Sequence, residues 1–196
     1  MPPELIQGFR KSEIRCDDDR LTARIICDCD MKNYISRTGA IGALLDEYER
    51  AIDDLKSIIQ NISVKKLAAV VDDQTKDEDC RSVQTILTHV VGSGYNYALV
   101  MDRLKHPGLT YRDKIPRNEP GEYLKDLDMV FQYTEKVLGQ FTDMEIEETD
   151  NSKKILTRWN QWYDIEQLIE HAIVHILRHR RQIEKFMIRL EDRFQS

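Results

Sequence analysis

Residues 170–183 read EHAIVHILRHRRQI and carry three of the protein's five histidines, His171, His175 and His179, at steps of four. The segment belongs to a longer pattern that begins at Asp164, in which apolar side chains recur every three or four residues almost to the C-terminus. This spacing predicts a long amphipathic helix. Side chains four residues apart stand one above the other on a helix, so two histidine rings can converge on one ion.

Three segments that precede this helix show the same helical spacing. The expected helices cover residues 36–62, 82–104 and 120–141. Ser82 is a favoured residue type for a helix N-cap, and Asp164 and Gln167 have the spacing of a capping box. Four long amphipathic helices bury their apolar stripes best in a four-helix bundle. The sequence therefore predicts an all-α fold over residues 34–196.

Two glycines, Gly92 and Gly94, interrupt the second of these helices. Each costs about 1 kcal/mol in helix propensity relative to alanine. We therefore expect them to give room to a neighbouring backbone or to a ligand. The polar run of residues 72–79, which precedes this helix, is interpreted as a surface loop.

The first 33 residues do not follow the helical pattern. Between Leu21 and Met31, apolar side chains alternate with mostly polar ones, which is typical of a half-buried strand. We therefore divide the chain into a non-helical N-terminal arm, residues 1–33, which can form a short β-hairpin, and the bundle, residues 34–196. An isolated hairpin is barely stable in water, so the arm is expected to pack on the bundle or to be exchanged within a dimer.

Composition excludes several classes of protein. A chain of 196 residues is long enough for one domain with an apolar core. The net charge of -6 argues against binding to nucleic acid. The sequence contains no run of about 18 uncharged apolar residues, so it predicts no membrane-spanning helix. Because the first residues lack the pattern of a signal peptide, we expect a cytoplasmic protein, with its four cysteines as free thiols.

The position of each histidine around its helix separates candidate ligands from the rest. At about 100° per residue, His179 falls within the apolar stripe, His175 at its edge, and His171 further round towards solvent. His89 lies about 120° from the centre of its own stripe, yet each helix of a bundle faces two neighbours. We predict that His89, His175 and His179 meet and hold one divalent metal. The alternative is that the helical pair is solvated or lies at the edge of the core without a metal.

Three neutral imidazoles suit zinc, nickel, iron or copper. Three protein ligands leave positions open for water or substrate, which is the pattern of catalytic zinc sites. A metal there acidifies bound water or deprotonates a coordinated thiol. The sequence contains no P-loop, no G-x-S-x-G and no H-E-x-x-H. The competing hypothesis is a non-enzymatic bundle that binds a partner or a ligand, with the metal structural or absent.

Two motifs resemble those of the DinB/YfiT-like metalloenzyme family. Residues 82–91, SVQTILTHVV, resemble the motif of its second helix, and residues 175–183, HILRHRRQI, resemble the motif of its fourth helix. In the latter, two histidines lie four apart and the second is followed by Arg, a small residue and Gln. This chain departs from the pattern in two places. Arg181 stands where the small residue is usual, and Cys80-Arg81 precedes the serine cap where an aromatic residue is frequent.

The resemblance extends over residues 34–195 and implies a four-helix bundle in which His89, His175 and His179 bind nickel or zinc. It also implies a homodimer. Members with assigned activities are similar to S-transferases or isomerases that use a low-molecular-weight thiol such as bacillithiol or mycothiol. The resemblance thus implies a metal-dependent enzyme, either a thiol-dependent S-transferase or a metal-dependent hydrolase, which acts on a small molecule that the sequence does not identify.

Overall fold

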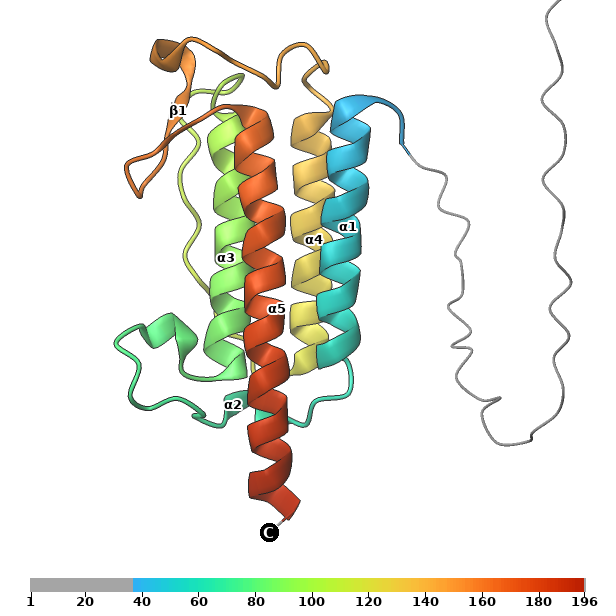
Figure 1. Cartoon of the computed structure of the whole chain (residues 1–196), viewed down its shortest axis with the longest axis vertical. Helices are drawn as coiled ribbons and strands as arrows, with labels where there is room; N and C mark the ends of the chain where they lie inside the picture. Colours follow the sequence, from blue (N-terminus) through green and yellow to red (C-terminus); the bar gives the residue numbers. More distant parts are fainter. Residues whose placement is uncertain (1–36, 196) are drawn as a thin grey trace, which may run out of the picture. The chain divides into compact units, whose positions relative to one another are not determined.

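The computed structural model describes residues 37–195, and these residues form an all-α bundle, as predicted (Figure 1). Its long helices are α1 (Gly39–Ile59), α3 (Val83–Asp102), α4 (Pro120–Leu138) and α5 (Ile165–Gln195). The shorter elements are α2 (Val64–Ala68), the 3-10 turns η1 (Glu78–Cys80) and η2 (Asn151–Lys153), and the antiparallel pair β1 (Ile155–Leu156) and β2 (Trp162–Tyr163). The predicted arm, residues 1–33, lies outside the described residues, so its hairpin and the division of the chain stay predictions.

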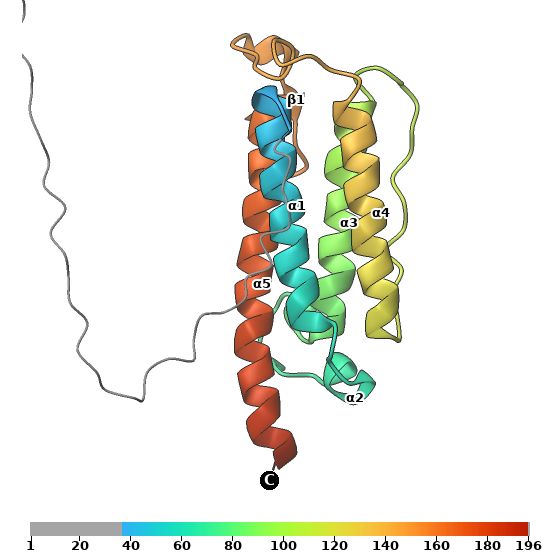
Figure 2. The ribbon, with the colours of Figure 1, turned by 90° about the vertical axis from the view of Figure 1, so that its right-hand side faces the viewer.

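The order of the helices around the bundle brings α3 next to α5. Helix α1 packs against α4 and α5, and α3 packs against the same two helices. Helices α3 and α4 run in the same direction, because residues 103–119 return along the bundle between them (Figures 1 and 2). Helix α5 runs antiparallel to α3. The contact between α3 and α5 is the one that a site made of His89 and the α5 histidines requires.

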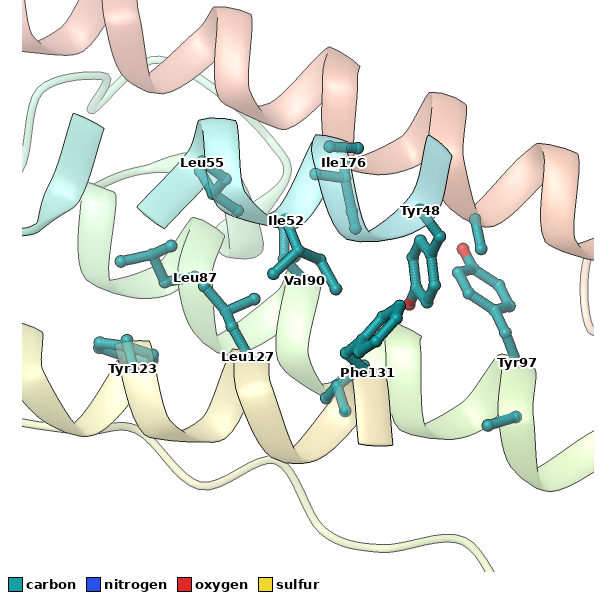
Figure 3. Packing of buried hydrophobic residues seen from close by; sticks show 14 of the residues in the cluster. Tyr48, Ile52, Leu55, Leu87, Val90, Tyr97, Tyr123, Leu127, Phe131 and Ile176 are labelled. Atoms are coloured by element: carbon teal, nitrogen blue, oxygen red, sulfur yellow. The ribbon is translucent and has the colours of Figure 1, made fainter. Parts of the chain in front are cut away.

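Apolar side chains from all four long helices meet in the interior (Figure 3). The buried side chains labelled there include Ile52 and Leu55 of α1, Leu87 and Val90 of α3, Leu127 and Phe131 of α4, and Ile176 of α5. Full burial of one such side chain stabilises the fold by about 1.5–3 kcal/mol. The stripes that predicted the helices are thus the faces that form the core.

Local hydrogen bonds fix the starts of the two helices that carry the histidines. Ser82 Oγ accepts from the Thr85 backbone N–H at 3.0 Å, and Thr85 Oγ1 accepts from the Ser82 N–H at 3.0 Å. Asp164 and Gln167 form the predicted capping box, with bonds of 2.9 and 3.2 Å. Both caps satisfy N–H groups that a helix start leaves without a partner. Helices α1, α3 and α4 end two or three residues before the predicted ends, and α5 runs almost to the C-terminus as predicted.

Both interrupting glycines of α3 lie where another segment comes close, but the neighbours are side chains rather than backbone. A Cβ atom at Gly94 would lie 2.5 Å from Val130 Cγ1 and 3.2 Å from the hydroxyl of Tyr48. A Cβ atom at Gly92 would lie 3.1 Å from Cγ of Lys114. Gly94 therefore allows α4 to approach α3, and Gly92 allows the stem of Lys114 to cross α3.

Replacing Gly94 with alanine is expected to lower the free energy of unfolding. Overpacking against Val130 costs about 1–3 kcal/mol, and the better helix propensity of alanine returns about 1 kcal/mol of this. We expect a net loss of up to about 2 kcal/mol in urea denaturation followed by circular dichroism. Gly121→Ala is the matched control, since a Cβ there meets nothing within 4 Å. Equal unfolding midpoints for the two variants would contradict close packing at Gly94.

Candidate metal centre

Three histidines from two neighbouring helices meet in one cluster. His89 comes from α3, and His175 and His179 come from α5. The Nε2 atoms of His89 and His175 are 2.9 Å apart. The ring centroids lie 4.5 Å apart for His175 and His179, 4.9 Å for His89 and His175, and 5.0 Å for His89 and His179. One nitrogen from each ring lies within 4.8 Å of the other two. The structure thus brings together the three residues selected from the sequence.

The orientation of the rings suits a divalent ion. His89 Nδ1 lies 3.0 Å from Asp79 Oδ2, and His179 Nδ1 lies 3.1 Å from Gln182 Oε1. When each Nδ1 donates its proton to that oxygen, Nε2 keeps a lone pair directed into the cluster. Two nitrogens that each lie about 2.1 Å from one ion are separated by about 3 Å, close to the spacing observed for His89 and His175. The donor set therefore fits a transition metal.

Burial keeps the three rings neutral. Burial, together with the neighbouring His179 and His89, lowers the pKa of His175 to about 3. Burial and the neighbouring His89 lower the pKa of His179 to about 4. Burial also lowers the pKa of His89, although Asp79 opposes this effect. Neutral imidazole is the form that binds a metal, so the cluster is ready to do so at neutral pH.

Asp79 belongs to the site, although the sequence assigned it to a surface loop. It lies in η1, and its Oδ2 accepts hydrogen bonds from Lys114 Nζ as well as from His89. Burial acts to raise the pKa of Asp79, but the hydrogen bond from Lys114 and the charge of His89 outweigh it and lower the pKa. Asp79 is therefore a carboxylate that holds the His89 ring. Only the fold reveals this, because a spacing of ten residues matches no metal-site motif.

His171 is not one of the three clustered histidines, and the face of α5 that helical spacing turns towards solvent is partly covered at this position. Its ring stacks on Trp159 at 4.8 Å between centroids and meets Tyr97 edge-on at 5.6 Å. The side chain is partly buried, and burial lowers the pKa of His171. The connection between α4 and α5, which carries Trp159, covers this face of α5. The helical pattern of α5 alone cannot show such a cover.

A cavity of about 230 Å³ lies beside the cluster. His89 and Tyr97 of α3 line one side, and Tyr111 and Lys114 of the α3–α4 connection line another. The β1–β2 segment contributes further side chains, Trp159 among them. Trp159 therefore both packs on His171 and lines this cavity. Of the three histidines, His89 lines this cavity, so a small molecule in it would reach the cluster on the side of His89.

A four-helix bundle with three converging histidines beside a cavity defines a candidate metal-binding bundle protein. A model of the DinB family matches residues 32–190, well over half of the sequence, and the chain therefore belongs to this family. No curated protein and no solved structure gave a match to the chain. Within the described residues, no helix has both the length and the apolar character needed to cross a membrane.

The histidine cluster is expected to make the metal-free protein less stable in acid. Below the usual histidine pKa of 6.5, His175 and His179 are protonated in the unfolded chain but stay neutral in the folded protein. The unfolded state then binds more protons, so stability falls as pH falls from about 6.5 towards about 4. After allowance for solvent screening, we expect a loss on the order of 2 kcal/mol between about pH 7 and pH 5.

Urea denaturation of chelator-treated protein at several pH values measures this loss. The double variant His175→Gln, His179→Gln removes both titrating rings and is expected to show a flatter dependence over the same range. Identical slopes for wild type and the double variant would contradict the assignment.

Proposed function

We propose that the protein is a metal-dependent enzyme that holds one nickel or zinc ion through His89, His175 and His179. The observation that carries this proposal is the convergence of three neutral imidazoles, two of them fixed through Nδ1, beside a cavity of about 230 Å³. When bound, the ion has positions left for a ligand and acidifies a coordinated thiol or water.

The chain's own residues hold and shield this centre. Asp79 and Gln182 fix the orientations of His89 and His179, which keeps both Nε2 atoms directed at one point. Tyr97 meets the His175 ring edge-on, with 5.7 Å between centroids, and is itself buried. Such aromatic cover limits the access of water and strengthens electrostatic interactions within the site.

Transfer by a thiol is the reaction that the cavity supports best. Of the described residues that line it, none is acidic and His89 is the one histidine, so the wall offers no free general base. A metal-coordinated thiol loses its proton without one. In the proposed S-transfer, a low-molecular-weight thiol gives its proton to solvent. Its sulfur then forms a bond to an electrophilic carbon, and the displaced group leaves with the electron pair of the broken bond.

Hydrolysis is the second candidate reaction, since the same centre can activate water. The non-enzymatic alternative is a bundle with a structural metal. Structural zinc sites are usually closed by four protein ligands, whereas the described residues bring three together beside a cavity. Chelation separates the two. A structural site resists the chelator and unfolds when stripped, while a catalytic site releases the metal and stays folded.

The direct test is elemental analysis of protein purified without added metal or a His tag, followed by a thiol assay. Bacillithiol and mycothiol are supplied with monochlorobimane as the electrophile, and conjugation is followed by fluorescence. We expect about one metal per chain and a rate that chelation abolishes and nickel or zinc restores. A metal-free protein, or a rate unaffected by chelation, would refute the proposal. Metal-dependent ester hydrolysis without thiol conjugation would favour the hydrolase.

We further propose that the enzyme is a cytoplasmic homodimer that acts on a small molecule rather than on nucleic acid. The resemblance to DinB/YfiT-like proteins supports the dimer, and the net charge of -6 argues against nucleic acid. Sedimentation of the full chain measures the oligomeric state. A monomer at all accessible concentrations would contradict the dimer.

A further inference from the structure

The cavity beside the histidines has a charge unlike that of the whole chain. The sequence contains 35 acidic residues and has a net charge of -6. Of the described residues that line the cavity, however, none is acidic, and two are basic, Lys114 and Arg158. A cavity wall with cations and without carboxylates favours an anionic ligand.

Arg158 is the basic residue that is available to such a ligand. Lys114 donates to Asp79, so its charge is already matched by a carboxylate. Arg158 has no ion pair with any residue in the part of the chain that the structure describes, and its guanidinium lies over the Tyr111 ring at 5.1 Å. A guanidinium that stacks through its face keeps its N–H groups directed outward, where they can bind a carboxylate through two hydrogen bonds. A second guanidinium, that of Arg103, lies 4.4 Å from the same ring.

The remainder of the cavity suits an apolar body. Tyr97 and Trp159 meet edge-on with 6.1 Å between their centroids, and Leu168 and Val100 also line the wall. The volume of about 230 Å³ allows a molecule about the size of one ring with a short chain. Aromatic walls with a few well-placed polar groups are the usual composition of a small-molecule site.

We propose that the cavity binds a small aromatic or aliphatic carboxylate, with its acid group on Arg158 and its apolar part against Tyr97 and Trp159. The inference rests on the proposed function in taking this molecule to be the substrate of the metal centre. The pocket then selects anionic electrophiles and places their apolar body beside His89.

The test compares two probes of the same shape, hydrocinnamate and its neutral amide, by calorimetry. Wild-type protein is expected to bind the anion about five- to tenfold more tightly than the amide. Arg158→Gln should reduce this preference to about one while leaving the affinity for the amide unchanged. Arg158→Lys keeps the charge and should keep most of the preference. Arg181→Gln, an exposed position outside the residues that line the cavity, should keep all of it.

Fluorescence locates the probe. The sequence contains two tryptophans, so Trp162→Phe leaves Trp159 as the sole tryptophan. Hydrocinnamate should change the fluorescence emission of Trp159 over the same concentrations at which calorimetry shows binding. The preference should also persist after chelation, because it arises from Arg158 and not from coordination to a metal.

Each remaining outcome decides the inference. No binding of either probe, a preference unchanged in Arg158→Gln, or a preference lost on chelation would each overturn it. Failure of the proposed function has a different signature. In that case the protein contains no metal and conjugates no thiol, while the preference that depends on Arg158 remains.

Discussion

Replacing His179 with alanine will weaken the affinity for nickel or zinc by more than about 100-fold. His179 is 3% exposed and is the most buried of the three histidines. Its loss removes one of the three proposed ligands and leaves the Gln182 amide oxygen without the ring that it holds. Competition with a chromophoric chelator measures the affinity for the metal, and elemental analysis of the purified variant measures its metal content.

His171→Ala is the matched control, because it makes the same chemical change on the same helix. The His171 ring stacks on Trp159 outside the cluster, so this variant should keep its metal. His179→Gln preserves more of the buried volume and guards against a variant that simply fails to fold. If His179→Gln folds and keeps its metal, or if His171→Ala loses as much as His179→Ala, the ligand assignment is wrong.

The parts of the site that the sequence predicted are those governed by local spacing. His175 and His179 lie four apart on one helix, so their proximity follows from helical geometry alone. The predicted N-cap at Ser82 is local in the same sense. The position of His89 is different, because its contact with His175 depends on α3 and α5 being neighbours. The family resemblance supplied that contact, which helical periodicity does not encode.

The parts of the site that helical spacing does not locate lie in connections between helices. Asp79 precedes α3 and Trp159 precedes α5, and neither belongs to an apolar stripe. The path of a connection depends on many weak contacts, so no repeat in the sequence reports it. For the same reason, the helical spacing of α5 does not show that His171 is partly covered. The packing of Trp159 over this face of α5 is visible only in the three-dimensional structure.

Asp79→Asn tests whether this missed carboxylate positions His89. The amide oxygen at this position can still accept from Nδ1, but the negative charge is gone. Loss of an outer partner of a metal-binding histidine typically weakens metal affinity by about 10–100-fold. We expect about tenfold for Asp79→Asn and a larger loss for Asp79→Ala, measured by the same chelator competition. Asp73→Asn, an exposed position in the same acidic connection, is the control for net charge.

The pH dependence of this effect separates a positioning role from a general loss of stability. Asp79 raises the pKa of His89, so it strengthens the binding of protons and of metal alike. As the pH falls through the pKa of His89, which lies below the usual 6.5, protons compete with the metal for this ring. They compete more strongly in the wild type, because Asp79 gives its His89 the higher pKa. The ratio of wild-type to Asp79→Asn affinity should accordingly shrink below about pH 6. A ratio independent of pH, together with a lower melting temperature of the metal-free variant, would instead assign Asp79 to the stability of the fold.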